Sequence, residues 1–355
     1  MRILHTADVH LRGNRDERWH ALEAVLEAAV REAAGVVVVA GDLFDRDVDA
    51  PALKTDLRRR FEHFAGRVLI IPGNHDERGL RPGDFFGENV RVLAGHDTVA
   101  EIDGVRFVGV PFEDLGIDDT LRRLREAAKQ RGDGVSVLIY HGELLDLAPG
   151  AGVFGEEEGR EYMPARLSDL AELGFHYVLA GHFHRAHDVR ACGTGYFVYS
   201  GSPVSITRRE TGRRHATVVD VGAAPRPLAL DTHHFATLDV RLSPGEDEHP
   251  VARVERELSA LDPRASALVT VRGFVDLSRF GLREDEFHLA LKEARARFNV
   301  AEFDAGACLD VGSILSADLF RRFASKLDRS VLSPEDRALA RDMAIRAMME
   351  VPDAR

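Results

Sequence analysis

The chain has 355 residues, of which 45% are hydrophobic, and it carries a formal net charge of -12 at pH 7. This length and composition suit a globular protein of about two domains. The acidic balance argues against a protein that holds nucleic acid by its overall field, because that mode needs a basic surface. Cys192 and Cys308 do not make a disulfide framework and lack the clustered spacing of a zinc site.

The beginning of the chain predicts a cytoplasmic location. Met1 is followed at once by RILHTADVH, without a charged-then-apolar leader. No apolar run approaches the roughly 20 residues that a membrane span needs. We therefore expect no membrane partner.

The first 180 residues alternate between predicted strands and helices. Apolar and β-branched runs indicate strands at 2–7, 36–40 and 68–71, with helices over 17–34 and from Pro51 between them. After short strands between 90 and 110, the pattern resumes with a helix at 117–131, a strand at 135–140, a helix at 165–173 and a strand at 175–180. This alternation predicts right-handed βαβ units and a parallel sheet.

The rest of the chain differs in pattern. Residues 186–232 indicate short strands and turns, residues 236–310 a small αβ unit, and residues 311–355 helices. We therefore expect three parts: 1–232, 236–310 and a C-terminal helical segment over 311–355.

Polar residues of one chemical kind follow five of the predicted strands. They are Asp8, His10, Asp42, Asn74, His75, His141, His182 and His184. The carboxyl ends of strands are where ligands collect in open α/β sheets, so these loops can meet in space. Imidazole and carboxylate suit Mn, Fe or Zn, and the set is too large for one ion. It fits two ions with a bridging carboxylate, which can clamp a phosphate and activate water for attack.

Each of these residues also has an ordinary interpretation when it is taken alone. Gly41-Asp42 can be a simple turn, and a lone His141 can be a structural histidine. Their order, each after its own strand, argues against unrelated turns. His75 then stands out as a histidine next to a ligand, able to neutralise the phosphate or protonate the leaving oxygen.

The motifs DxH, GD, GNHD, a lone His and GHxH, in this order, resemble the calcineurin-like metallophosphoesterase superfamily over residues 1 to about 232. Three further segments resemble its SbcD/Mre11 branch of DNA-repair nucleases: RILHTADVHL at the start, VVVAGDLFD at 37–45 and GSP at 201–203. Asp45 is similar to the bacterial SbcD pattern, since Mre11 proper tends to have histidine there.

The resemblance implies a fold and a role for each site residue. The fold would be a four-layer α/β/β/α sandwich followed by a small αβ capping domain and C-terminal helices. The residues would hold two divalent metal ions, usually Mn²⁺: one on Asp8, His10 and His184, the other on Asn74, His141 and His182, with Asp42 bridging. His75 would be catalytic, and Asp76 and Asp45 would orient the ligands, Asp76 by contacting a histidine.

The resemblance also implies partners. DNA would be admitted with help from the capping domain, and an SMC-like ATPase of the Rad50/SbcC type would bind C-terminal helices such as residues 344–351, unless that helix packs on its own domain. A homodimer through helices of the core is a further expectation. Arginines in two basic segments are candidate DNA contacts, with solvated turns as the alternative: Arg12, Arg15, Arg208, Arg209, Arg213 and Arg214.

The function expected first is a Mn-dependent 3′-5′ exonuclease and endonuclease in DNA repair, which hydrolyses phosphodiesters with a two-metal-activated hydroxide. A phosphodiesterase or phosphatase for nucleotides or other small phosphates would use the same eight residues. A scaffold subunit with a vestigial site is the third interpretation, ranked last because all eight positions are intact.

Overall fold

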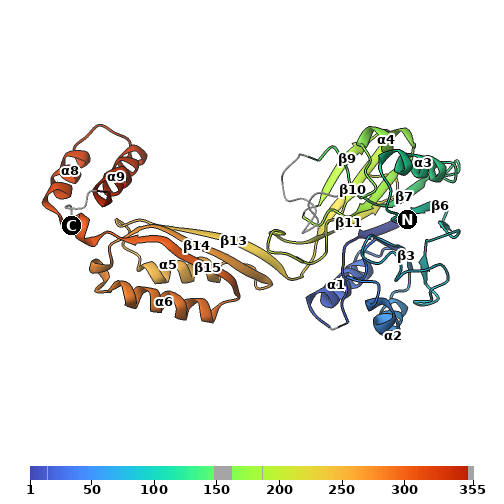
Figure 1. Cartoon of the computed structure of the whole chain (residues 1–355), viewed down its shortest axis with the longest axis horizontal. Helices are drawn as coiled ribbons and strands as arrows, with labels where there is room; N and C mark the ends of the chain where they lie inside the picture. Colours follow the sequence, from blue (N-terminus) through green and yellow to red (C-terminus); the bar gives the residue numbers. More distant parts are fainter. Residues whose placement is uncertain (14, 148–161, 186, 351–355) are drawn as a thin grey trace. The chain divides into compact units, whose positions relative to one another are not determined.

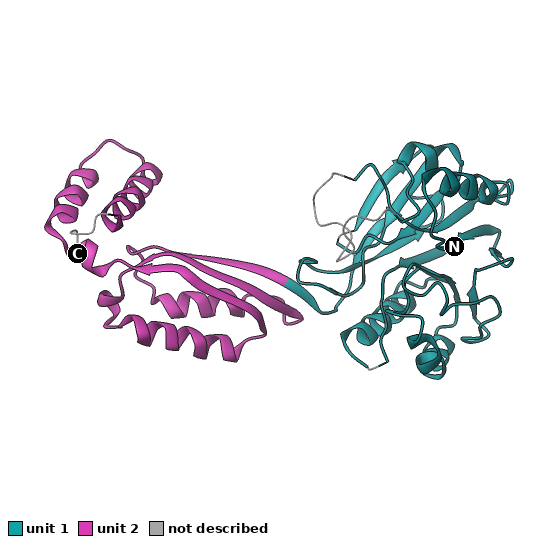
Figure 2. Ribbon diagram, viewed as in Figure 1, with its two compact units in different colours: residues 1–235 teal, residues 236–355 magenta. Residues whose placement is uncertain are grey.

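The computed structural model of the chain describes residues 1–13, 15–147, 162–185 and 187–350. The chain divides after Phe235 into two compact units, which Figure 2 draws in separate colours. No helix within these described ranges is long and apolar enough to cross a membrane. Both cysteines are buried and unpaired.

The first unit contains two six-stranded sheets. The first sheet has the order β12-β11-β1-β2-β3-β4, and its strands are Arg226–Ala229, His215–Asp220, Arg2–Thr6, Val36–Ala40, Arg67–Ile71 and Val90–Val92. Strands β1 to β4 are parallel, whereas β11 and β12 are antiparallel to their neighbours. The βαβ units predicted at the start of the chain are therefore present.

The second sheet has the order β5-β6-β7-β8-β10-β9. Its strands are Val99–Ile102, Val105–Val110, Ser136–His141, Tyr177–Gly181, Gly195–Tyr199 and Asp188–Cys192. Strands β6, β7, β8 and β10 are parallel, and the two edge strands are antiparallel to them. The strands that end at His141 and at Gly181 thus belong to a different sheet from β1, β2 and β3.

The side chains of β2 show how the layers are held together. Because neighbouring residues of a strand point to opposite faces, Val37 and Val39 join a core with the helices α1 (Glu17–Arg31) and α2 (Asp49–Glu62). Val36 and Val38 join a second core with the inner face of β7. Burying both faces explains the unbroken apolar run of this strand.

The outer face of the second sheet is covered by two more helices, α3 (Ile117–Ala128) and α4 (Leu167–Glu172). Leu138 of β7 packs there with Leu124 and Leu170 from these helices. The layers are therefore helix, sheet, sheet and helix, as Figure 1 also shows for the labelled helices. The predicted α/β/β/α sandwich is confirmed.

One helix boundary differs from the sequence prediction. Helix α2 begins at Asp49, two residues before Pro51, which was expected to open it. Pro51 is tolerated at this third position because the first N–H groups of a helix have no partner within the helix.

The second unit is an αβ unit followed by helices. Its three-stranded sheet, β13-β14-β15, is formed by His234–Leu242, Ala265–Val275 and Val300–Asp310. Helices α5 (Pro250–Ser259) and α6 (Glu284–Arg297) share its apolar core, through residues such as Val254 and Phe287. Helices α7 (Gly312–Ser316), α8 (Asp318–Asp328) and α9 (Pro334–Met349) form a smaller core around Phe274, Phe320 and Ile345.

Candidate metal centre

The carboxyl ends of five strands from both sheets meet at one place. Direct hydrogen bonds tie their loops together: His10 N donates to Asp42 O over 2.9 Å, and His75 N to Asp42 Oδ1 over 2.9 Å. His182 N donates to Asp8 Oδ1 over 3.0 Å, which joins the second sheet to the first. The eight residues predicted from the sequence are therefore brought together.

Four of these residues can hold one metal ion. Ligand atoms of Asp8, His10, Asp42 and His184 all lie within 4.8 Å of one another. The Nε2 atoms of His10 and His184 are 3.2 Å apart, and His10 Nε2 lies 3.6 Å from Asp42 Oδ2. Ligand atoms that are each about 2.1 Å from one ion are about 3 to 4 Å apart, so these spacings fit a bound ion.

A second set of ligand atoms adjoins the first. His141 Nε2 lies 2.9 Å from Asn74 Oδ1 and 3.4 Å from Asp42 Oδ2, and its ring centroid is 5.5 Å from that of His182. His141 Nδ1 donates to Ala40 O over 2.8 Å, so its Nε2 is the atom that faces the other ligands. A histidine that binds a metal through one ring nitrogen usually donates a hydrogen bond from the other, often to a backbone carbonyl.

Asp42 Oδ2 is the atom that both sets share. It is buried and has no hydrogen-bond partner among the described residues, although it lies near Nε2 of His10 and of His141. Burial alone would favour the neutral acid, but the neighbouring His141 and His10 outweigh it and lower the pKa of Asp42. An ionised, buried oxygen between two groups of histidines fits a carboxylate that binds two cations.

The pKa values of the surrounding groups have the same origin. Burial lowers the pKa of His10 and of His182 and raises that of Asp8. For His141, burial acts in the same direction as for His10, but Asp42 outweighs it and raises the pKa to about 9. Burial thus disfavours charge on His10, His182 and Asp8, whereas the charge of Asp42 favours a protonated His141.

The loops of this centre have an unusual backbone. Asp8, His10, Asp42 and His182 all have positive φ, at 56°, 51°, 51° and 96°. Non-glycine residues rarely adopt such angles, and where they do the residues cluster at functional sites. Within the described ranges, seven non-glycine residues have positive φ, and four of them are predicted metal ligands.

The close packing around Gly41 explains why a glycine precedes Asp42. Its φ is 92°, and a Cβ at this position would lie 2.1 Å from His141 Nδ1. A larger residue would push the imidazole away from Ala40 O. The glycine of the GD motif therefore allows close packing against His141, next to the candidate metal ligand Asp42.

His75 and Asp45 lie on the partly exposed side of the centre. His75 Nδ1 donates to Asp45 O over 3.1 Å, and its ring centroid is 4.7 Å from that of His10. Asp45 Oδ1 lies 3.7 Å from His10 Nδ1 and accepts a hydrogen bond from Arg18 over 2.6 Å. Asp45 thus supports both histidines, His75 through its carbonyl and His10 through its carboxylate.

Asp76 was expected to orient a histidine, and this expectation is wrong. Its Oδ1 accepts from Gly73 N over 2.7 Å and its Oδ2 from Phe44 N over 3.0 Å. Burial, followed by the charge of Asp42, raises the pKa of Asp76 to about 7. The buried side chain thus links the backbones of the GD and GNHD loops. A short carboxylate in a tight turn lies close to the backbone amides of that turn, so it accepts hydrogen bonds from them and not from a histidine.

Glu210 belongs to the centre although the sequence did not indicate it. This buried carboxylate lies 3.5 Å from His184 Nδ1, on the side of the ring opposite to His10. It also accepts from Ile206 N over 2.9 Å and from Thr207 N and Oγ1 over 3.2 and 3.1 Å. For His184, burial acts against protonation, but the nearby carboxylate of Glu210 outweighs it and raises the pKa.

Arg214 was a candidate DNA contact, but it is buried. Its guanidinium donates to Ser202 O and Arg185 O, each over 3.0 Å, and to His184 O. These bonds hold the GSP segment against the GHFH loop. Because the side chain is enclosed in this way, it has no surface to offer to DNA, and the expectation is corrected.

The other candidate arginines are exposed. Arg12 pairs with Asp45 at 3.0 Å, beside the centre, whereas Arg15 pairs with Asp56 of α2 at 3.2 Å. Arg208, Arg209 and Arg213 are exposed in the turn that contains Glu210. Contact of these residues with DNA stays a prediction.

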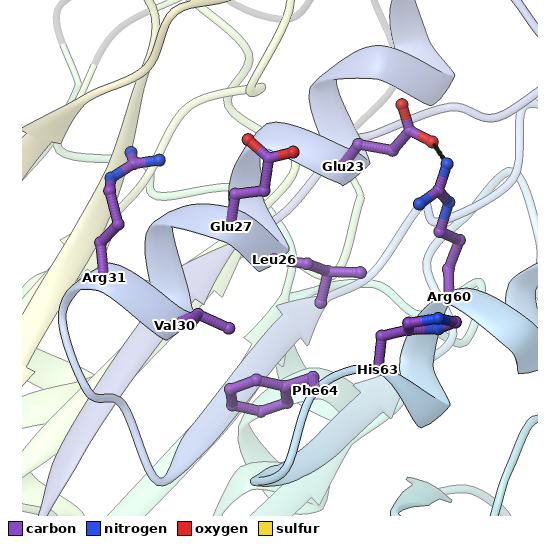
Figure 3. A pocket seen from close by; sticks show the side chains of 8 residues that line it. All are labelled: Glu23, Leu26, Glu27, Val30, Arg31, Arg60, His63 and Phe64. Carbon is purple, nitrogen blue, oxygen red and sulfur yellow. Dashed lines mark ion pairs between the residues drawn. The ribbon is translucent and has the colours of Figure 1, made fainter.

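A separate hollow of about 400 Å³ lies between α1 and α2 (Figure 3). Leu26, Val30 and Phe64 form its apolar part, and Glu23 forms an ion pair with Arg60 at one side. It contains none of the predicted site residues. Its chemistry is that of a packing surface between helices and not of a metal centre.

The fold and the paired ligand sets define a dinuclear metal-dependent phosphoesterase. The family model for calcineurin-like phosphoesterases matches residues 1–186, which is more than half of the chain. The chain belongs to this family.

Curated relatives lie in the branch expected from the motifs. The chain is 27% identical over 231 residues to the DNA double-strand break repair protein Mre11 of Aeropyrum pernix, with 56% of this chain and 53% of that protein covered. It is 29% identical over 265 residues to the SbcD component of the nuclease SbcCD of Bacillus subtilis, with 62% and 66% covered. The chain thus spans between about half and two thirds of the length of these relatives.

Solved structures of similar fold include TT1561 of Thermus thermophilus, with 17% identity and a TM-score of 0.45 over 64% of this chain and 98% of that one. A dimetal phosphatase from Danio rerio has 12% identity and a TM-score of 0.43, over 65% and 96%. Similarity at this level says nothing about substrate.

Proposed function

We propose that this chain is a Mn²⁺-dependent DNA exonuclease and endonuclease of the SbcD/Mre11 type. The observation that carries the proposal is the placement of Asp42 Oδ2 between Nε2 of His10 and Nε2 of His141, which joins two ligand sets through one oxygen. When bound there, two divalent ions neutralise phosphate charge and lower the pKa of a water molecule. The matches to Mre11 and SbcD relatives support DNA as the substrate.

The geometry supports a role for each ligand. We assign one ion to Asp8, His10, His184 and Asp42, whose ligand atoms cluster within 4.8 Å. The other ion is assigned to Asn74, His141 and His182, with Asp42 shared. Asn74, His75 and His184 are the partly exposed members of the set, so substrate approaches from their side.

His75 is proposed to act on the phosphate. Its Nδ1–H donates to Asp45 O, which directs the other ring nitrogen away from this carbonyl. The ring is held over the edge of His10 and is anchored through its own backbone N–H to Asp42. A histidine fixed in this way can stabilise the charge of the transition state or give a proton to the leaving oxygen.

An SMC-like ATPase of the Rad50/SbcC type is proposed to bind the C-terminal helices. Leu319, Leu339 and Met343 on α8 and α9 are 68%, 59% and 62% exposed, whereas Ile345 is buried against Phe274. Helix α9 therefore packs on its own unit with one face and offers apolar side chains on another. Val351 at the end of the expected contact lies outside the described residues.

The test is metal-dependent digestion of duplex DNA labelled at the 5′ or the 3′ end, with Asp42→Ala as the inactive control. Mn²⁺ should support degradation by the full chain, and the control should be inactive because the shared oxygen is gone. Hydrolysis of bis-p-nitrophenyl phosphate is measured in parallel. If that compound is hydrolysed while neither duplex nor single-stranded DNA is degraded, the small-phosphate function replaces the nuclease.

A further inference from the structure

A groove beside the metal centre has the charge and shape of a binding site. It has a volume of about 390 Å³ and is lined by Arg78, Arg81, Pro82, Phe112, Glu113 and Arg123, among others. We call it the arginine groove. Small-molecule sites are about 300 to 1,000 Å³ in volume, so this groove has room for about one nucleotide.

The arginine groove adjoins the second ligand set. Phe112 N donates to Pro72 O over 3.0 Å, and both residues line the groove. The ring centroid of Phe112 is 6.5 Å from that of His141, with the rings edge to face. One wall of the groove is therefore in contact with a predicted metal ligand.

The loop that bears two of the arginines is fixed relative to the catalytic loop. Gly79 N and Leu80 N donate to Asp76 O over 3.0 and 3.1 Å. Arg78 N and Gly79 N donate to Asp47 Oδ1 over 2.8 and 2.7 Å. Since Asp76 directly follows His75, the same short segment positions the catalytic histidine and then Arg78 and Arg81.

The charges of the groove are only partly compensated. The lining has three arginines and two glutamates, Glu77 and Glu113, and Arg123 forms an ion pair with Glu113 at 3.2 Å. Arg81 Nε donates to Arg78 O, and neither guanidinium has a carboxylate within ion-pair distance in the part of the chain that the structure describes. On a chain with a net charge of -12, two exposed and uncompensated guanidinium groups next to a phosphoesterase centre point to an anionic ligand.

We propose that the arginine groove holds the nucleotide adjacent to the scissile phosphodiester of single-stranded DNA. Arg78 and Arg81 bind the neighbouring phosphate, and the exposed Pro82 provides apolar surface for the sugar, whereas the buried Phe112 forms the base of the groove. The site would position the strand without reading its sequence, because its polar contacts are to phosphate. This inference rests on the proposed nuclease function.

The test uses the double variant Arg78→Ala/Arg81→Ala in the full chain. KM for a single-stranded oligonucleotide should rise at least about tenfold, because two charge-assisted contacts are lost. The ratio of kcat/KM for the oligonucleotide to kcat/KM for bis-p-nitrophenyl phosphate should fall by a similar factor. Arg122→Ala is the matched control, since Arg122 neighbours Arg123 on α3 but pairs with Asp119 and does not line the groove.

A second measurement does not depend on turnover. On a His75→Ala background, oligonucleotide binding is titrated against salt, and the slope of log K against log salt should fall by about 1.4 in the double variant, at about 0.7 per phosphate contact. An unchanged slope and KM with active wild-type protein would overturn the inference alone. Arginine-dependent binding without DNA cleavage would overturn the nuclease function and leave the groove as a binding site for single-stranded DNA, and a wild type that neither binds nor cleaves would overturn both.

Discussion

Replacing Glu210 with glutamine should weaken metal binding although Glu210 binds no metal itself. Its carboxylate accepts three hydrogen bonds from Ile206 and Thr207 and lies 3.5 Å from His184 Nδ1. Glutamine has nearly the same shape as glutamate but only one acceptor oxygen. Its NH₂ group would point at a group that donates a hydrogen bond to Glu210 in the wild type, so that bond would be lost. Losing such a support costs about 10- to 100-fold in metal affinity, or about 1.4 to 2.7 kcal/mol.

The assay is calorimetric titration of metal-free protein with Mn²⁺, with Glu172→Gln as the control. Glu172 is exposed at the end of α4 and makes no contact with the centre, so its variant should bind Mn²⁺ like the wild type. In Glu210→Gln, one of the two binding events should weaken, because only the ion on His184 is affected. Two binding events of wild-type affinity in a folded variant would refute this role of Glu210.

Three further predictions concern the same centre. His75→Ala should retain both Mn²⁺ ions and lose turnover by at least about 100-fold, measured on bis-p-nitrophenyl phosphate; loss of metal would contradict its assignment. Gly41→Ala should lower the free energy of unfolding in urea by more than about 1 kcal/mol beyond Gly222→Ala, since both residues have φ of 92° but only Gly41 faces His141. Adding Mn²⁺ to the metal-free protein at about 100 times the Kd of each site should stabilise it by about 2.7 kcal/mol per bound ion, seen as a higher Tm; an unchanged Tm would argue against ligands that are organised only in the folded state.

Most of the candidate metal ligands could be predicted because their signal is local. A β-branched run such as VVVVA marks a buried strand, and the polar residue that follows its glycine lies at the strand end. The periodicity alone indicated one parallel sheet. That the strands before His141 and His182 form a second sheet depends on packing between distant segments, which the resemblance supplied and hydrophobic spacing does not encode.

Glu210, Arg214 and Asp76 show what the sequence could not reveal. Glu210 and Arg214 lie in a turn with several exposed arginines, and charge patterning cannot tell a buried member of such a turn from a solvated one. Asp76 was placed correctly beside the site, but its partners are two backbone amides brought together by β2 and β3. Partners of this kind follow from tertiary structure and leave no periodic pattern.

The positive φ angles of Asp8, His10, Asp42 and His182 have a consequence for how the protein tolerates mutations. Such conformations cost about 1 to 3 kcal/mol each, so four of them cost about 4 to 12 kcal/mol, which is of the order of the net stability of a whole domain, about 5 to 15 kcal/mol. The packing of the sandwich must therefore offset this conformational cost in addition to the cost of ordering the chain. Core mutations that a simple structural domain tolerates would here release the ligand loops first, so that activity disappears in a population of chains that still look folded.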